Sequence, residues 1–90
     1  MDGQGHFPVQ LFCVVSTLGD MTPIQFRYED EEHRINTVRI TQVLSHKETQ
    51  YAGTKAILYT CSAVIGEREV YFELRYNIET HRWVFNRKWN

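Results

Sequence analysis

The sequence predicts an all-β fold: a single small antiparallel meander of about six strands, forming a closed or half-closed barrel, SH3-like or similar. Three observations support this prediction. Short runs rich in β-branched and aromatic residues are separated by turn signals. Helical periodicity is weak along the chain, and the final three runs can be paired in a register that collects apolar residues on one face. Because an open sheet of this size would expose one face and two edges, we expect closure or dimerisation.

The composition is that of one globular domain. The chain has 90 residues, 42% of them hydrophobic and 13% aromatic, and its formal net charge is −1. We expect one domain over residues 1–90, with residues 1–6 as a flexible N-terminal tail. No apolar run is long enough to span a membrane, and the first residues lack the features of a signal peptide. The expected location is therefore cytoplasmic, and no overall charge attracts nucleic acid or anionic membrane.

The sequence of the first half of the chain predicts three strands and a long loop. Gly19-Asp20 ends the first strand, Pro23 lies where the second begins, and the acidic run 29–32 reads as a solvated turn. Broken alternation in the third strand indicates a β-bulge near Thr41-Gln42. The polar stretch that follows is interpreted as the longest loop, with room for one helical turn. In order, these segments are Phe7 to Thr17, Ile24 to Tyr28, Ile35 to Ser45 and the loop His46 to Thr54.

The second half predicts a hairpin of defined register. Gly66-Glu67 separates the runs Lys55 to Ile65 and Arg68 to Ile78, and a two-residue loop with Gly first fixes the pairing. One face then pairs apolar residues: Ala63 with Val70, Cys61 with Phe72, Tyr59 with Leu74 and Ile57 with Tyr76. The other face pairs Ser62 with Tyr71, Thr60 with Glu73 and Leu58 with Arg75.

A four-residue loop, Glu79 to Arg82, is expected to lead into the last strand. This loop would place Trp83 opposite Ile78, Phe85 opposite Tyr76, Trp89 opposite Phe72 and Lys88 opposite Glu73. The aromatic residues of three strands would then share one buried surface, and Lys88 and Glu73 would form a cross-strand ion pair.

The sequence contains no recognisable catalytic, metal-binding or cofactor motif. HExxH, CxxC, GxSxG and phosphate-binding glycine patterns are missing, and Glu69 and Glu73 would lie ~13 Å apart along one strand, further than a glycosidase pair. We therefore expect no enzyme, no cofactor and no metal. Cys13 and Cys61 are expected to be ordinary core thiols without a disulfide. The four histidines fall in the tail or in predicted turns: His6, His33, His46 and His81.

One candidate binding surface stands out. Small β-barrels bind single-stranded nucleic acid by combining basic groups with aromatic stacking platforms, and the last two strands could present such a set. Glu69 and Glu73 share this face and would repel phosphates. The alternative to a binding surface is therefore a solvent-exposed face with ordinary cross-strand pairs and no binding function. The candidate residues are Tyr71, Arg75, Arg82, Arg87 and Lys88.

Four stretches carry a resemblance to other proteins: 22–28 (TPIQFRY), 38–44 (VRITQVL), 71–76 (YFELRY) and 83–89 (WVFNRKW). Their apolar and aromatic positions, over about 60 residues, resemble a loose group of small uncharacterised all-β bacterial proteins of Firmicutes and Actinobacteria, some encoded beside Y-family translesion DNA polymerases. Tyr28 stands where that pattern often has Trp, and Phe85 where it has Leu. The resemblance implies an accessory role around DNA repair or mobile elements and carries over no catalytic residue.

The sequence thus favours a non-enzymatic protein-interaction or accessory module with an unknown protein partner. A partner strand would add to an exposed edge, supplied by the strand Phe7 to Thr17 or by the final strand, and a homodimer could form in the same way. The alternative is a weak single-stranded nucleic-acid-binding barrel. An enzyme or small-molecule binder would require a deep pocket with convergent polar groups.

Overall fold

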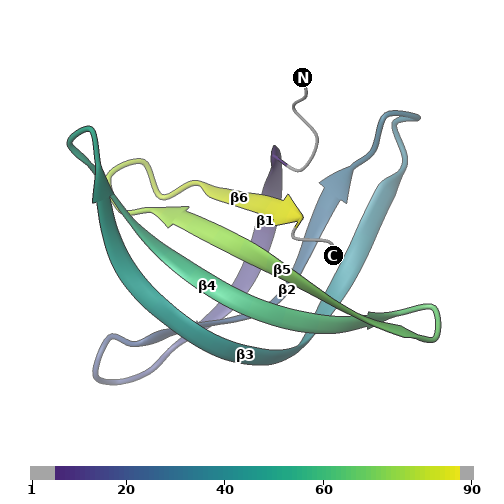
Figure 1. Ribbon diagram of the computed structural model, residues 1–90, viewed down its shortest axis with the longest axis horizontal. Coiled ribbons are helices and arrows are strands. Elements are labelled where there is room, and N and C mark those ends of the chain that lie inside the picture. The colour runs from purple at the N-terminus through teal and green to yellow at the C-terminus, as the bar shows by residue number, and fades with distance from the viewer. Residues whose placement is uncertain (1–5, 88–90) are drawn as a thin grey trace.

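The computed structural model describes residues 6–87, without the side chains of His6, Tyr51 and Arg87. The described residues form an all-β closed barrel of six antiparallel strands in sequence order (Figure 1). The strands are β1 (His6–Val15), β2 (Met21–Glu29), β3 (Ile35–Tyr51), β4 (Thr54–Ile65), β5 (Arg68–Asn77) and β6 (Trp83–Arg87). His6, expected in the tail, begins β1, and the rest of the expected tail lies outside the described residues.

The barrel closes because two strands each change partner along their length. Residues 6–9 of β1 pair with β6, whereas residues 10–15 pair with β2. Residues 35–39 of β3 pair with β2, and the pairing with β4 begins at Ile40. The polypeptide therefore forms two sheets that share β1 and β3, and these strands curve around the core (Figure 1).

An aromatic cluster fills the barrel. Phe26, Phe72 and Phe85 are buried, and their ring centroids lie 4.9 to 5.6 Å apart in mutually tilted or edge-on arrangements. Such geometries suit the aromatic quadrupole, and each ring buries roughly 150–250 Å². Leu74 and Trp83 extend the same buried surface. The predicted apolar face of the final strands is therefore the wall of the core.

The β4–β5 hairpin has the predicted register throughout. Ile65 pairs with Arg68, Cys61 with Phe72, and Ile57 with Tyr76. Gly66 has a φ of 67°, a left-handed conformation that a glycine at the first loop position adopts without strain.

The predicted register between β5 and β6 is wrong by two residues. Trp83 pairs with Tyr76 and Phe85 with Leu74. The loop begins one residue earlier than expected because the Asn77 side chain accepts hydrogen bonds from the amides of Glu79 (2.9 Å) and Thr80 (3.0 Å). A shift of two residues leaves each side chain on its predicted face, so Trp83 and Phe85 are buried as expected. Trp89 and Lys88 lie outside the described residues, and Glu73 pairs with Asn86.

The predicted loop His46 to Thr54 is also wrong. This polar stretch continues β3 as far as Tyr51, and a two-residue turn at Ala52-Gly53 leads into β4. Both turn residues have positive φ, 52° and 82°, which is the type I′ geometry of a tight hairpin. We call β3 from Ser45 onward, its turn, and the first residues of β4 up to Leu58 the polar arm.

Irregular pairing explains two features of the sequence. The register of β3 against β4 shifts between Ile40 and Gln42, which confirms the predicted bulge, and shifts again between Val43 and Ser45. The register of β1 against β2 shifts beside Pro23, which lies inside β2, not where it begins. β3 pairs with β2 only from Gln25 onward. The missing N–H of Pro23 therefore removes no hydrogen bond of the sheet.

Candidate binding surfaces

The predicted binding residues do not form one compact surface within the described chain. Tyr71 and Arg75 lie on the outer face of β5, and Arg82 is exposed in the loop before β6. Tyr71 and Arg75 are four positions apart along the strand, a distance of about 13 Å. Arg87 pairs with Phe72 through its backbone, its side chain is outside the described set, and Lys88 lies beyond the described residues.

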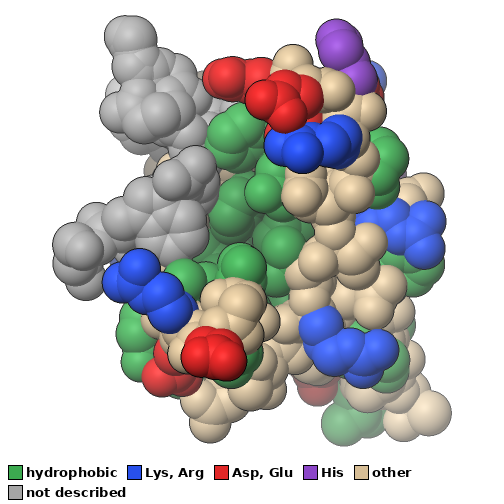
Figure 2. All heavy atoms as spheres, turned by 90° about the vertical axis from the view of Figure 1, so that its right-hand side faces the viewer, with side chains coloured by type: hydrophobic (Ala, Val, Ile, Leu, Met, Phe, Trp, Pro, Cys, Tyr) green, Lys and Arg blue, Asp and Glu red, His purple; other side chains and the backbone are tan. Residues whose placement is uncertain are grey.

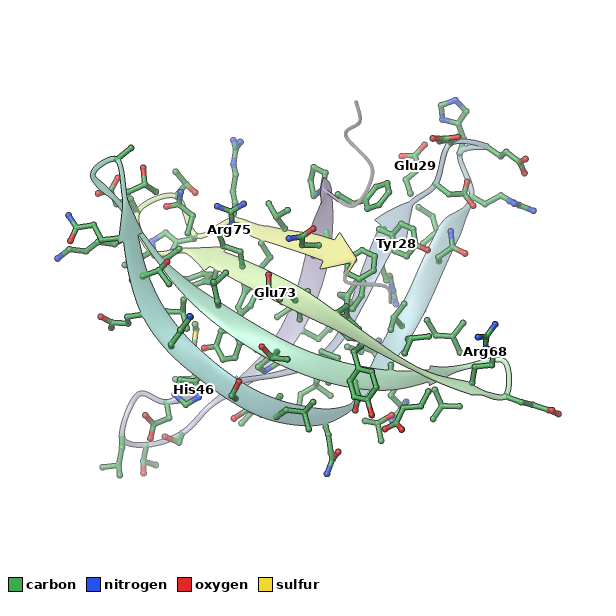
Figure 3. All side chains as sticks on the ribbon, viewed as in Figure 1. Tyr28, Glu29, His46, Arg68, Glu73 and Arg75 are labelled. Atoms are coloured by element: carbon green, nitrogen blue, oxygen red, sulfur yellow. The ribbon has the colours of Figure 1, made fainter. Side chains whose placement is uncertain are left out.

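Acidic residues interrupt that face. Glu69 and Glu73 alternate with Tyr71 and Arg75 on the same side of β5, and Figure 3 labels Glu73 and Arg75 along this strand. Glu73 is half-buried and engaged in an interaction of its own. Carboxylates at alternate positions leave no continuous positive track for phosphates.

A cavity of about 320 Å³ opens at one mouth of the barrel. Two aromatic rings, Phe7 and Tyr28, lie 5.7 Å apart and form its apolar part. Figure 2 shows this hollow with apolar side chains inside and acidic side chains above it, and Figure 3 shows Tyr28 and Glu29 on β2 at this end. The rim comes from the β2–β3 turn: Asp30, Glu31, Glu32 and Arg34.

Two carboxylates of this rim, Asp30 and Glu32, are engaged within the turn. Asp30 accepts hydrogen bonds from the amides of Glu32 (2.9 Å) and Arg34 (3.0 Å) and from the Asn36 side chain (3.0 Å). These bonds, that from the Arg34 amide foremost, lower the pKa of Asp30 to about 2. Glu32 forms an ion pair with Arg34 (2.7 Å). A carboxylate that stays ionised near neutral pH and is committed to its own turn is a poor general acid or base.

The histidines have local roles. His33 bonds to Glu29 (2.8 Å) in the β2–β3 turn, and His81 bonds to the Tyr76 hydroxyl (2.7 Å) in the β5–β6 loop, both in turns as expected. His46 was expected in a loop but lies on β3, where its ring stacks on Tyr59 at 5.7 Å (Figure 3). The buried Tyr59 hydroxyl donates to the Met21 carbonyl (3.4 Å) and so connects β4 to β2.

The two cysteines differ. Cys61 is buried, as expected, and burial raises the pKa of its thiol to about 12. Cys13 was also expected in the core, but it is exposed on β1. The apolar run Leu11–Val15 suggested a buried strand; its second half instead extends past the core.

The end of the β1–β2 hairpin carries a group of exposed apolar side chains; further exposed apolar residues, Val64 and Ile65, lie at the end of the β4–β5 hairpin. Phe12 is 40% exposed, Val14 56% and Leu18, in the turn, 88%. Val15 and Ile24 are exposed as well, so both faces of this hairpin present apolar side chains. The guanidinium of Arg27 lies 5.2 Å from the centroid of the Phe12 ring, a cation–π contact that leaves much of the ring in solvent. We call residues 12–24 the apolar arm; its turn lies at the lower left of Figure 1.

The polar arm provides an internal comparison. It projects from the same barrel, but its exposed residues from Ser45 to Gln50 are polar or charged. A hairpin selected only for solubility is expected to look like the polar arm. The apolar arm departs from that pattern, and clustered exposed apolar residues mark interaction sites on soluble proteins.

The apolar arm also has an unpaired edge. β1 pairs with β6 only as far as Val9, opposite Trp83. Within the described chain, no strand pairs with residues 10–15 on that side. The expected edge at strand one is thus present only in its second half. The final strand supplies none at residues 83–86, because β6 is paired there with both β5 and β1.

The described residues contain no group of three or more His, Cys, Asp or Glu side chains that could hold a metal ion. Within residues 6–87, no helix could cross a membrane. The chain matches no family model, no curated protein and no solved structure.

Proposed function

We propose that this barrel is a non-enzymatic protein-interaction module that docks its partner through the apolar arm. The observation that carries the proposal is the exposure of Phe12, Val14 and Leu18 on a hairpin whose first strand, β1, has no neighbour on one side along residues 10–15 within the described chain. Apolar side chains supply the burial energy of an interface, and an open strand edge supplies backbone hydrogen bonds.

The free energy gained by burying the exposed side chains of the apolar arm suits a specific interface of modest affinity. Fully burying a Phe, Leu or Val side chain is worth roughly 1.5–3 kcal/mol relative to full exposure. Several half-exposed apolar residues of the arm would together contribute a few kcal/mol before the costs of association are subtracted. The same residues left in solvent in a lone monomer would favour aggregation, so a docking role accounts for their exposure.

Two features support a binding role without catalysis. Asp30 and Glu32, at the rim of the barrel-mouth cavity, are engaged within the β2–β3 turn, and hydrogen bonds hold Asp30 ionised. Of the two thiols, Cys61 is buried and stays protonated. The accessory role near DNA repair or mobile elements, and the cytoplasmic location, remain proposals; a polymerase gene beside this gene would support that cellular context.

Affinity capture with a pair of matched variants tests the docking proposal. Phe12→Asp with Val14→Asp places two carboxylates on the apolar arm, and Ser45→Asp with Gln50→Asp adds the same charge to the polar arm. We expect the native chain and the polar-arm variant to retain the same partner, identified by mass spectrometry, and the apolar-arm variant to lose it. Retention of that partner by both variants would contradict the proposal.

The second candidate, single-stranded nucleic-acid binding, depends on the exposed residues Tyr71 and Arg75 on β5 and Arg82 in the loop before β6. Such binding must weaken as salt rises. Titration of a labelled oligonucleotide at low and at moderate salt tests it. A signal that falls with salt and is lost in Arg75→Ala would favour this candidate, whereas flat titrations at both salt concentrations would exclude it.

A further inference from the structure

The free edge of β1 begins where its pairing with β6 ends. Phe7 and Val9 pair with Phe85 and Trp83 of β6. Pairing with β6 then stops, and the same edge continues along residues 10–15 without a neighbour among the described residues. A strand added to this edge therefore has room only between Val9 and the β1–β2 turn.

The orientation of the free groups follows from the turn. The Ser16 amide donates to the Asp20 carbonyl (2.8 Å) and the Ser16 carbonyl accepts from the Gly19 amide (2.9 Å), so the backbone N–H and C=O of Ser16 both point into the hairpin, toward β2. Hydrogen-bonded and non-hydrogen-bonded pairs alternate along an antiparallel ladder. The backbone N–H and C=O groups of Val15, Cys13 and Leu11 therefore point away from β2, toward the open side. Pro23, which has no N–H, lies opposite Cys13 in keeping with this alternation.

We propose that a second copy of this chain occupies this edge, with β1 pairing antiparallel to β1 of the other copy about Cys13. The inference rests on the proposed function and names the partner of the same apolar arm. In this register Leu11 lies opposite Val15 of the second copy, Phe12 opposite Val14, and Gln10 opposite Ser16. Other symmetric registers would centre on a different residue of β1. The register centred on Cys13 uses the outward-facing backbone groups of Leu11, Cys13 and Val15, and the second copy does not reach Val9, where Trp83 of β6 already occupies the edge.

The residues on this edge are complementary to themselves. Residues 10–16 carry no charge, so antiparallel self-pairing brings no like charges together. Phe12 and Val14 would form aromatic–β-branched cross-strand pairs, which are among the stabilising kinds. At each end, Arg27, the neighbour of Gln10, would share a row with Asp20 of the second copy, the neighbour of Ser16. These two residues would lie three strand spacings apart, about 14 Å, so they add no like-charge repulsion but form no ion pair.

Sedimentation equilibrium of the full chain, measured over a wide concentration range, tests the dimer. We expect the mass to rise from that of one copy to that of two as concentration increases. Phe12→Lys with Val14→Lys would place like charges opposite each other twice, and the dissociation constant should rise by at least about tenfold. Phe12→Lys with Val14→Glu would place opposite charges at the same positions and should restore dimerisation, in a salt-dependent manner. If the Lys/Glu pair restores dimerisation and the Lys/Lys pair does not, residue 12 must face residue 14 of the second copy, as this register requires.

Cross-linking gives an independent readout of the same register. Directly opposite residues of a hydrogen-bonded antiparallel pair have Cα atoms about 5.5 Å apart, so a short bismaleimide should link the two Cys13 thiols. We expect a covalent dimer in the native chain and none in Cys13→Ser, and the buried Cys61 should not react. A dimer without this link, or one unaffected by the Phe12 and Val14 variants, would overturn the proposal.

A monomer at all concentrations would also overturn the dimer, but it would leave the docking function intact if the apolar-arm variant still loses a different captured protein. If the chain stays monomeric and capture is also insensitive to the apolar arm, both proposals fail. The two experiments therefore distinguish the identity of the partner from the role of the surface.

Discussion

Ser62 has a buried hydroxyl without a hydrogen-bond partner. It faces the outer side of β4, yet it is fully buried, and its Oγ is unpaired within the described residues. A buried polar group that loses its water without replacement costs about 1–3 kcal/mol. We expect Ser62→Ala to raise the free energy of unfolding by about 1 kcal/mol in urea denaturation, and the exposed Ser45→Ala to leave it unchanged. A loss of stability on Ser62→Ala would show that the hydroxyl is bonded.

The buried thiol of Cys61 should make the fold less stable at alkaline pH. The pKa of its thiol is about 12 in the folded chain, against 9.0 for a free thiol, because burial disfavours the thiolate. The unfolded chain therefore loses this proton first, and the free energy of unfolding should fall as pH rises from about 9 toward 12. Burial also raises the pKa of Tyr59, which acts in the same direction.

Denaturation of Cys61→Ala measures the contribution of the thiol. This variant should be less stable near neutral pH, because it leaves a cavity, but it should lose less additional stability between about pH 9 and 11. Equal slopes for the native chain and the variant would contradict the assignment. Alkylation of the native chain should modify Cys13 and leave Cys61 unmodified.

Among the elements, the β3–β4 turn holds a strained residue that can be improved. Ala52 has a φ of 52°, which a residue with a Cβ adopts at a cost, and Gly53 follows it at 82°. Asn-Gly is the preferred pair for this type I′ turn. We expect Ala52→Asn to raise the free energy of unfolding by up to about 1 kcal/mol, and with it the melting temperature, without changing the circular dichroism spectrum. An unchanged or lower melting temperature would contradict the assigned turn geometry.

The elements also show what sequence patterns could predict. The β4–β5 register followed from Gly66-Glu67 because a tight loop and a one-sided apolar pattern leave few alternatives. The predicted β5–β6 register is wrong because the Asn77 side chain binds the amides of the following loop residues and so ends β5 one residue earlier than the apolar pattern indicates. The sequence predicts a loop where the structure has the polar arm, since strands exposed on both faces lack the alternation by which strands are recognised. Ala52-Gly53 is the remaining local signal of a hairpin.

The candidate site was less predictable than the fold. Tyr71 and Arg75 were correctly placed on one face of β5, but the exposed apolar arm was missed. A continuous apolar run such as Leu11–Val15 suggests burial on both sides, and only the three-dimensional curvature of β1 takes its second half beyond the core. Leu18, a large apolar residue in a turn, was the available hint.

At the scale of the whole molecule, closure depends on β1 meeting β6, two strands at opposite ends of the described chain. No local signal sets this pairing; burial of the shared aromatic core does. Phe7, on β1, stacks on Phe85 of β6 at 5.9 Å, and Phe85 in turn contacts Phe26 of β2 at 4.9 Å. The core therefore connects strands that are remote in sequence.

Phe26 and Phe12 lie on the inner and outer faces of the β1–β2 pair, and substitutions at these two residues test whether the core and the apolar arm contribute differently to stability. Phe26 is fully buried, whereas Phe12 is 40% exposed. We expect Phe26→Ala to lower the free energy of unfolding by about 3–5 kcal/mol, a large part of the stability of a small domain. Phe12→Ala should cost the monomer less than about 1 kcal/mol. Equal losses from the two changes, measured by urea denaturation at low protein concentration, would show that Phe12 is a core residue.

Residue-resolved amide hydrogen exchange at low and high protein concentration tests the role of the β1 edge most directly. We predict a slowly exchanging Val9 amide throughout, and Cys13 and Val15 amides that exchange fast in dilute solution and slowly in concentrated solution. The Glu48 amide, on the polar arm, should exchange fast in both. Slow exchange of Cys13 and Val15 at low concentration would mean that the edge is already covered within one chain, and fast exchange at both concentrations would mean that a second copy does not bind there.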